Sequence, residues 1–332
     1  MRKLSAPVML AVILLAPATG IPSDTPITRD IPGLQAFVHD VSERHALEPE
    51  RVERVLADAQ HQQDIIDAIT SPAEALPWHR YRSIFLQEDR IRDGVSFWDE
   101  NEELLSRVAD EYGVDPAILV AIIGVETRYG EHSGRHRVLD ALFTLAFDYP
   151  PRADFFRSEL EHFLLLTEEE GLDPFEIRGS YAGAMGMPQF IASSYRHYAV
   201  DGSGDGRRDL MNDVADAVAS VGNYFSEHGW RAGAPVVAPA NVADDADTHA
   251  FTGDGIRLTT TVGELREAGI DPEAEFRDDA QALFLELDGA SGAEHWVGLR
   301  NFYVITRYNH SPLYALAAFQ LAEAIRDEWE AR

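Results

Sequence analysis

Glu126 is the carboxylate whose surroundings in the sequence are most unusual. It is the last residue of the run 118–126, and all eight residues before it in this run are apolar or glycine. A carboxyl group in apolar surroundings is costly to ionise, so its pKa rises and it can stay protonated near neutral pH. That protonation state is the one a general acid needs. The alternative is a carboxylate at a helix end that pairs with Arg128 or with an arginine on another helix.

Residues 179–190 are rich in glycine and contain Ser180 and Gln189. Three glycines within eight residues allow a tight loop whose backbone can approach a ligand closely. The two polar side chains could then hydrogen-bond a neutral polar ligand such as a sugar amide. No phosphate-binding lysine follows, and the spacing matches no dinucleotide fingerprint. Close helix packing around the glycines is the alternative.

Residues 201–209 match the first half of a calcium-binding loop. Oxygen-bearing side chains occupy positions 1, 3 and 5, and glycine occupies position 6. Asn212 stands where an EF-hand has its glutamate at position 12, although Asp213 or Asp216 could supply a later carboxylate. Asp, Gly and Ser are also common turn residues, so a plain turn is the alternative.

Residues 301–311, followed closely by Tyr314, gather tyrosines and asparagine near an expected strand-to-helix junction. Aromatic rings stack on sugar faces and amides hydrogen-bond hydroxyls, so this composition suits a carbohydrate cleft. Core aromatics are the commoner explanation for any single ring. The sequence contains no GxSxG or HExxH motif and no obvious nucleophile–base pair.

Composition excludes several other kinds of site. The 332 residues contain no cysteine, so disulfides, thiolate zinc sites, iron–sulfur clusters and cysteine nucleophiles are excluded. Lys3 is the only lysine, which also excludes Schiff-base and P-loop chemistry from the mature domain. The 57 acidic and 28 basic residues give a formal net charge of -29. This charge disfavours binding to nucleic acid or to anionic lipid.

The N-terminus resembles a secretory signal peptide. A basic start at residues 1–3 precedes an apolar run over 4–16, and small residues follow up to Gly20. The run is short for a membrane span, and an uncleaved anchor is the alternative. No later stretch is long and apolar enough to span. An exported and soluble mature protein is therefore predicted.

The elements that must position these residues are mainly helical. Asp115 and Pro116 suit the N-cap and first turn of a helix that runs to about Arg128 and is expected in the centre of a core. Hydrophobic periodicity and residue composition predict the other elements. Helices are expected within 34–70 and at about 97–112, 153–169, 216–228 and 311–329, and short strands at 235–242, 249–261 and 281–288.

Five segments match a known family in the same order along the chain. They are residues 124–130, 147–150, 180–190, 216–225 and 301–309. Together they resemble the membrane-bound lytic murein transglycosylase B family, also called family 3 lytic transglycosylases. The match extends from about Trp78 to the C-terminus, and the motifs are jointly highly specific.

The resemblance implies a mainly α (α+β) fold, with a lysozyme-like helical catalytic core, an extra α-domain and a small β-rich domain. The expected division is a signal peptide (1–20), an α-domain (21–115), the catalytic core (116–230) with an EF-hand-like loop (201–216), the β-rich domain (231–297) and a C-terminal segment (298–332) that completes the cleft.

The resemblance further implies cleavage of the MurNAc-β-1,4-GlcNAc bond of peptidoglycan without water, which leaves 1,6-anhydro-MurNAc ends and needs no cofactor. Glu126 falls on the family's single catalytic residue, which acts first as acid and then as base. The implied glycan-cleft residues are Tyr81, Ser180, Gln189, Tyr224, Tyr308, Asn309 and Tyr314. A hydrolytic muramidase on the same fold and a non-catalytic peptidoglycan-binding protein are the alternative functions.

A structural calcium ion is also implied by the resemblance, with ligands from Asp201, Ser203, Asp205, Arg207 and Asp216. The sequence departs from the family pattern here, because the loop is one residue longer and Arg207 can offer only its carbonyl. Peptidoglycan strands are the expected partner, with other cell-wall enzymes as further candidates. Nucleic acid is not expected. The chain lacks a lipid-bearing cysteine, so the predicted location is the periplasm, without a membrane anchor in the mature chain.

Overall fold

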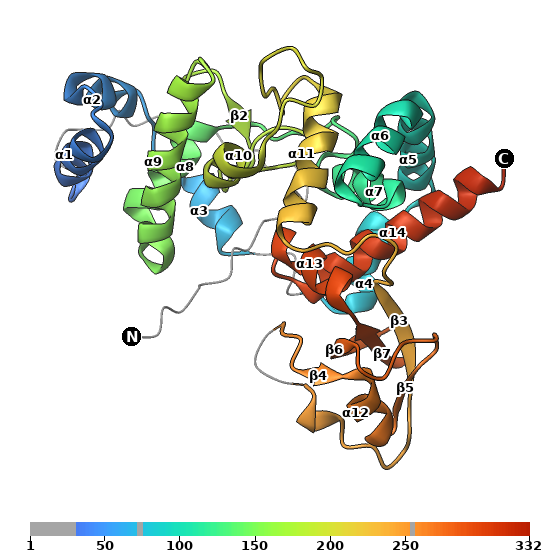
Figure 1. Ribbon diagram of the computed structural model, residues 1–332. Helices are drawn as coiled ribbons and strands as arrows, with labels where there is room; N and C mark the ends of the chain where they lie inside the picture. Colours follow the sequence, from blue (N-terminus) through green and yellow to red (C-terminus); the bar gives the residue numbers. More distant parts are fainter. Residues whose placement is uncertain (1–30, 72–75, 253–255) are drawn as a thin grey trace. The chain divides into compact units, whose positions relative to one another are not determined.

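The computed structural model describes residues 31–71, 76–252 and 256–332, and it is mainly helical with one small β-rich region (Figure 1). These residues form two compact units, each assembled from segments far apart in the sequence. The sheet unit contains the described residues within Ala73–Val125 and Gly222–Arg332. The Glu126 unit contains those within Ala11–Pro72 and Glu126–Val221.

Helices make up most of the Glu126 unit. They are α1 (Leu34–His45), α2 (Pro49–Ala57), α3 (Gln63–Ile69), α8 (Val138–Asp148), the short 3-10 helix η2 (Pro150–Arg152), α9 (Ala153–Glu169) and α10 (Ala192–Tyr198). α8 is buried from Val138 to Ala146 and packs along α9. α9 has the predicted bounds, because its apolar residues recur at helical spacing and bury Phe156 and Phe163 against this core.

The glycine-rich segment 179–190 is a hydrogen-bonded loop tied to a small sheet. β1 (His136–Arg137) pairs antiparallel with β2 (Arg178–Gly179). Two single bridges then fold the loop back on itself, from Gly179 to Met185 and from Met185 to Phe190. The loop is therefore fixed at its start, middle and end by backbone pairing.

The sheet unit contains α4 (Trp78–Phe85), α5 (Glu88–Glu100), α6 (Glu102–Tyr112), α12 (Val262–Glu267), α13 (Arg300–Tyr308) and α14 (Pro312–Glu330). The single helix predicted over 97–112 is wrong. Asn101 has φ -123° and ψ 21°, and its side-chain amide donates to the Phe97 carbonyl at 2.8 Å, which ends α5 and starts a new helix. Gly113 ends α6 in the left-handed conformation that glycine favours.

A five-stranded antiparallel sheet forms the β-rich region. Its strands lie in the order β4, β6, β7, β3 and β5. Their bounds are β3 (Val237–Val242), β4 (Thr260–Thr261), β5 (Ile270–Pro272), β6 (Gln281–Gly289) and β7 (Gly292–Gly298). The strands predicted at 235–242 and 281–288 are confirmed. The segment 249–261 contributes only the two residues of β4 among its described residues, after the 3-10 helix η3 (Thr248–Ala250).

The sheet packs on a small apolar core that includes Val262, Ile270, Phe284 and Val297. Thr261 caps α12 through a capping box with Glu264, which satisfies backbone donors at the start of that helix. Trp78 on α4 donates to the Glu294 carboxylate on β7 at 2.9 Å. The sheet is therefore attached to the helical part of its own unit by a polar contact as well as by packing.

Two helices belong partly to each unit. α7 (Pro116–Thr127) ends two residues after the boundary at Val125, and α11 (Val214–Glu227) crosses the boundary at Gly222. Asp115 accepts the Ala117 N–H at 2.9 Å, which confirms the predicted N-cap of α7. The helix is buried on every side from Ala117 to Val125, as its uniformly apolar sequence predicts.

The mainly α fold with a small β-rich region confirms the predicted fold class. The expected five-part division stays a prediction, and the signal peptide at 1–20 lies outside the described residues. Within the parts of the chain that the structure describes, no helix combines the length and apolarity needed to cross a membrane.

Candidate active site

Glu126 lies in the last turn of α7, directly after a run of buried residues that extends from Ala117 to Val125. The residue is 8% exposed. The backbone leaves the helix abruptly, because Arg128, Tyr129 and Gly130 all have positive φ, at 50°, 60° and 93°. Two consecutive non-glycine residues in this region are costly and persist only where the surroundings enforce them. The carboxylate therefore stands at a sharply fixed turn.

Thr127 fixes this turn from the residue next to Glu126. Its hydroxyl donates to the Met187 carbonyl at 2.9 Å and accepts the Gly130 N–H at 3.1 Å. Its own carbonyl accepts the His132 N–H at 2.9 Å. The side chain is 1% exposed, so these bonds are shielded from water. Thr127 thereby joins the end of α7 to the glycine-rich loop, a role that the sequence analysis did not predict.

The glycine-rich loop is close-packed as well as hydrogen-bonded. A Cβ on Gly179 would lie 2.1 Å from the Ala184 carbonyl oxygen, and one on Gly186 would lie 2.4 Å from that of Leu210. Ser180 is 3% exposed, and its hydroxyl accepts the Ala184 N–H at 3.0 Å. The glycines therefore permit close packing of backbone on backbone, and the approach of this loop to a ligand stays a prediction.

Gln189 is held inside the same loop. It is 2% exposed and has a φ of 50°, and its side-chain nitrogen donates to the Ser133 carbonyl at 3.0 Å and to the Gly186 carbonyl at 2.9 Å. These bonds use both amide N–H donors. Gln189 therefore joins the loop after α7 to the glycine-rich loop. Its predicted contact with substrate stays a prediction.

The predicted aromatic residues lie in the sheet unit, where Tyr224 and Tyr308 contact one another. Their rings are 4.9 Å apart in an edge-on arrangement, and Tyr224 also stacks on His228 at 4.0 Å. The Tyr224 hydroxyl donates to the Arg307 carbonyl at 2.6 Å. α11 is thus fixed against α13 through this tyrosine. His228 was not predicted, and only its one-turn spacing from Tyr224 could have indicated it.

Tyr81, Asn309 and Tyr314 are buried in the same unit, each with 1% exposure or less. Tyr81 packs against Phe85 with ring centroids 5.3 Å apart, and the Tyr314 N–H donates to Ser311, the N-cap of α14, at 3.3 Å. Their predicted roles in substrate binding, like those of Tyr224 and Tyr308, stay predictions.

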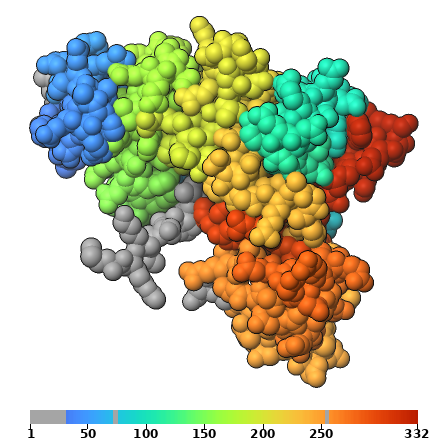
Figure 2. Space-filling model, in the orientation of Figure 1, coloured from blue at the N-terminus to red at the C-terminus, as the bar shows by residue number. Residues whose placement is uncertain are grey.

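Four of the predicted calcium ligands, Asp201, Ser203, Asp205 and Arg207, are exposed residues of one loop (yellow in Figure 2), and the fifth, Asp216, is in the first turn of α11. Their carboxylates face backbone donors instead of a common centre. Asp201 accepts the N–H groups of Gly204 at 2.6 Å and Gly206 at 2.7 Å, and the Asp205 carboxylate accepts the N–H of Arg207 at 2.8 Å.

Asp216 is 1% exposed, and its two oxygens accept the N–H groups of Gly202, Ser203 and Asp209 at 2.9, 3.1 and 2.7 Å. Across the described residues, no three His, Cys, Asp or Glu side chains are grouped so that they could hold a metal ion. In this arrangement the carboxylates of Asp201, Asp205 and Asp216 accept backbone N–H groups. Their role as calcium ligands stays a prediction.

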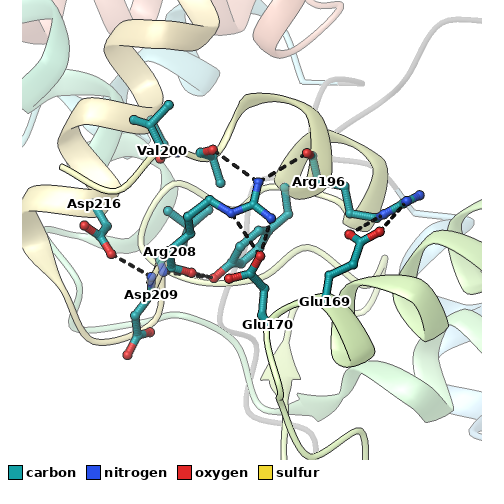
Figure 3. A network of polar contacts seen from close by, with 11 residues as sticks. Glu169, Glu170, Arg196, Val200, Arg208, Asp209 and Asp216 are labelled. Atoms are coloured by element: carbon teal, nitrogen blue, oxygen red, sulfur yellow. Dashed lines mark hydrogen bonds and ion pairs between the residues drawn. The ribbon is translucent and has the colours of Figure 1, made fainter. Parts of the chain in front are cut away.

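A polar network that the sequence analysis missed attaches the far side of this loop to α9 and α10 (Figure 3). Arg208 pairs with Glu170 and also points toward the carbonyls at the end of α10, and Arg196 pairs with Glu169. The two ion pairs join residues that are far apart in the sequence, 27 residues for Arg196 with Glu169 and 38 for Arg208 with Glu170. Spacing alone could not pair them.

Comparison with known proteins identifies close relatives. The family model described as "Transglycosylase SLT domain" matches residues 31–323. Membrane-bound lytic murein transglycosylase B of Escherichia coli (strain K12) is 40% identical over 304 residues, which cover 89% of this chain and 82% of that protein.

Two solved structures are similar over nearly the whole chain. Soluble lytic transglycosylase SltB1 from Pseudomonas aeruginosa has 47% identity and a TM-score of 0.84, with 90% of this chain and 99% of that one covered. The Escherichia coli lytic transglycosylase Slt35 in complex with calcium has 40% identity and a TM-score of 0.82, with 91% and 95% covered.

These similarities extend far beyond the individual motifs and include both units. They confirm the predicted lysozyme-like helical fold and the resemblance on which it rests. The chain therefore belongs to the lytic murein transglycosylase family, whose members cleave peptidoglycan by lytic transglycosylation.

Proposed function

We propose that Glu126 is the single catalytic carboxylate of this transglycosylase. Its position at the end of an apolar helix, with 8% of the residue exposed, carries the proposal. Low exposure favours the neutral form of a carboxyl group, which can donate a proton. The adjoining left-handed turn and the Thr127 hydrogen bonds restrict where the carboxyl group can point.

The proposed reaction consumes no water. Glu126 gives its proton to the oxygen between MurNAc and GlcNAc, the C1–O bond breaks, and positive charge develops at C1 of the muramoyl residue. The substrate's own N-acetyl oxygen stabilises that charge, where a retaining glycosidase would use a second carboxylate. The C6 hydroxyl then attacks C1, and its proton returns to Glu126. The product is a 1,6-anhydro-MurNAc end, and the enzyme regains its starting proton.

Substrate recognition in this proposal rests on hydrogen bonds and ring contacts. Ser180 and Gln189 in the Glu126 unit, and Tyr81, Tyr224, Tyr308, Asn309 and Tyr314 in the sheet unit, are the proposed glycan-cleft residues. Both the chain and peptidoglycan are anionic, so long-range attraction does not contribute. Binding should therefore not weaken as salt concentration rises.

The decisive experiment combines one substitution with product analysis. Glu126→Gln keeps the shape of the side chain but removes the acid, so kcat on purified sacculi should fall by about a thousandfold while binding to sacculi persists. Glu176→Gln, an exposed change in the same unit, is the matched control and should be fully active. Appreciable turnover by Glu126→Gln would reject the assignment.

Mass spectrometry of the released muropeptides tests the reaction itself. Products ending in 1,6-anhydromuramic acid are expected from the native protein. Products heavier by one water, with reducing ends, would instead identify a hydrolytic muramidase. Binding without release would identify a non-catalytic peptidoglycan-binding protein.

Catalysis by this route needs no cofactor. Residues 201–216, the Asp201 loop, would have to exchange several backbone hydrogen bonds for ion contacts before they could bind calcium. We expect full activity after dialysis against a chelator and no rise in Tm when Ca²⁺ is added. A chelator-induced loss that Ca²⁺ restores would show that a structural ion is needed.

The proposed site of action is the periplasm, where peptidoglycan strands are accessible, with the signal peptide at 1–20 directing export. Other cell-wall enzymes are the further proposed partners. Fractionation of cells that produce the full chain should place the protein in the periplasmic fraction. Recovery with the membrane after high-salt washing would contradict this proposal.

A further inference from the structure

Leu210 connects the Asp201 loop to the glycine-rich loop. Leu210 is fully buried, and its carbonyl accepts the Met187 N–H at 2.8 Å. The same carbonyl lies against Gly186, where an added Cβ would be 2.4 Å from its oxygen. The position of Leu210 therefore determines how the second half of the glycine-rich loop can lie.

Tyr195 holds Leu210 in place. Its ring lies in α10 and is fully buried, and its hydroxyl accepts the Leu210 N–H at 3.1 Å and donates to the Arg208 carbonyl. One hydroxyl thus satisfies a donor and an acceptor on either side of Asp209. A buried backbone group that loses its partner is costly, so this two-sided contact fixes the chain strongly.

Arg208 secures the same segment from its other side (Figure 3). Its Nε donates to Glu170 at 2.9 Å, and its terminal nitrogen reaches the Arg196 carbonyl at 3.4 Å. The Glu170 carboxylate belongs to the end of α9, whereas Arg196 lies in α10. Residues 208–210 are therefore held against two helices of the Glu126 unit.

The contacts continue from Leu210 to the proposed catalytic residue. The Met187 N–H donates to the Leu210 carbonyl, and the Met187 carbonyl accepts the Thr127 hydroxyl. Thr127 directly follows Glu126 in the chain. We propose that Tyr195 is a positioning residue for the Glu126 carboxyl group, acting through Leu210, Met187 and Thr127. This inference rests on the proposed catalytic role of Glu126.

The effect should fall on kcat. A carboxyl group must be held close to the productive geometry, and a displacement of about 1 Å can cost about a hundredfold in rate. Tyr195 has no described contact with any proposed cleft residue, including Ser180 and Gln189 of its own unit, so KM should change less than kcat. Tyr195→Phe removes only the hydroxyl, and we expect kcat to fall about tenfold with KM within about twofold.

Thr144→Val is the matched control for a general loss of stability. The Thr144 hydroxyl is also fully buried in the Glu126 unit, where it accepts the Gln62 N–H at 3.1 Å and donates to the Gln60 carbonyl at 3.5 Å. It has no described contact with residues 208–210, Met187 or Thr127. This variant should lose Tm as Tyr195→Phe does, yet keep its kcat.

The last link in the contact series supplies a coupling test. Thr127→Val should lower kcat, and Thr127→Ser, which keeps the hydroxyl, should restore it. If both hydroxyl groups act through Met187, the double variant of Tyr195→Phe with Thr127→Val should be no slower than Thr127→Val alone. Glu170→Gln, which weakens only the Arg208 contact, should lower kcat about twofold and is the substitute if Tyr195→Phe does not fold.

Four results would overturn the proposal. They are an unchanged kcat in Tyr195→Phe, an equal fall in kcat in Thr144→Val, fully multiplicative effects in the double variant, or an unchanged kcat in Glu170→Gln where that substitute is used. Failure of the proposed function is distinguished by Glu126→Gln. If that variant stays active, Glu126 is not the catalytic residue; if it is inactive while Tyr195→Phe is unaffected, only the positioning role is wrong.

Discussion

The glycine-rich loop (179–190) and the Asp201 loop (201–216) contain three glycines each, but the glycines are needed for partly different reasons. In the first, a Cβ on Gly179 or Gly186 would lie within 2.4 Å of a carbonyl oxygen. In the second, a Cβ on Gly204 or Gly206 would meet nothing within 4 Å, but both residues have positive φ, at 81° and 88°. Packing alone requires Gly179, whereas Gly186 is required both by packing and by its positive φ of 71°. Backbone handedness alone requires Gly204 and Gly206.

The two loops also differ in what stabilises them. Backbone bridges and close packing hold the glycine-rich loop. Carboxylates that accept backbone N–H groups hold the Asp201 loop, with Asp216 buried and Asp201 exposed. A loop fixed by packing tolerates no added volume, whereas one fixed by carboxylates depends on particular side chains and on pH. The contrast can be tested in four steps.

Gly179→Ala should have the largest effect. Gly179 does not have a positive φ, so the cost is one of packing: its Cβ would lie 2.1 Å from the Ala184 carbonyl oxygen and 2.9 Å from a Val138 methyl group. We expect a loss of about 3 kcal/mol in the free energy of unfolding. Urea denaturation followed by circular dichroism measures it. A loss in the free energy of unfolding below about 1 kcal/mol would show that the glycine-rich loop accommodates an added methyl group as easily as the Asp201 loop does.

Asp216→Ala should be second, because three backbone N–H groups lose their acceptor. A loss of about 2 kcal/mol is expected. Asp205→Ala is the comparison and should cost little, since within the described residues the exposed Asp205 carboxylate accepts only the Arg207 N–H. Thermal denaturation of both variants, compared at equal scan rate, checks the ranking. Equal losses would mean that burial of Asp216 is irrelevant.

Gly204→Ala should cost about 1 kcal/mol, the penalty of a left-handed residue with a Cβ. Space is not a factor, because nothing lies within 4 Å of the added atom. Gly204→Asn should recover part of the loss, since asparagine tolerates this conformation better than alanine. Unfolding curves for the two variants measure these losses. A larger loss of stability in Gly204→Asn than in Gly204→Ala would show that steric crowding contributes.

Acid pH should produce the smallest and most local effect. The Gly206 N–H, helped by those of Gly204 and Asp205, holds the pKa of Asp201 below its usual value of 3.8. A depressed pKa stabilises the folded loop above the ordinary value, and the contribution is lost as pH falls through the lowered one. Hydrogen exchange should therefore show loss of protection at 204–206 below about pH 3.8, before the amides of Met185 and Phe190 are affected. If both loops lost hydrogen-exchange protection at the same pH, the proposed difference in what stabilises them would be wrong.

Some of these features were readable in the sequence. α9 and α7 were predicted nearly to the residue, because each is a long apolar pattern with a clear start, at Ala153 and at Asp115-Pro116. The break at Asn101 was missed, because a side-chain bond to the Phe97 carbonyl ends one helix inside a continuous helical pattern. Local patterns predict elements well and predict their interruptions poorly.

The candidate site divides in the same way. Glu126 was identified from its own apolar run, and Gln189 from its glycine-rich context. The hydrogen bond from the Gln189 side chain to the Ser133 carbonyl was not predictable, because the two residues are 56 positions apart. The bond from the Thr127 hydroxyl to the Met187 carbonyl, across 60 positions, was not predictable either. Spacing along the chain carries no information about such partners.

The sequence by itself determined the helical character, the apolar helix that ends in Glu126, and the motifs that connect the chain with its family. These depend on residue type and short-range periodicity, which act within a few turns. Only the tertiary structure decided that Tyr195 holds Leu210, that Leu210 contacts Met187, and that Asp201 and Asp216 face backbone donors. Such contacts form between distant segments because buried backbone groups must find partners wherever folding brings them together.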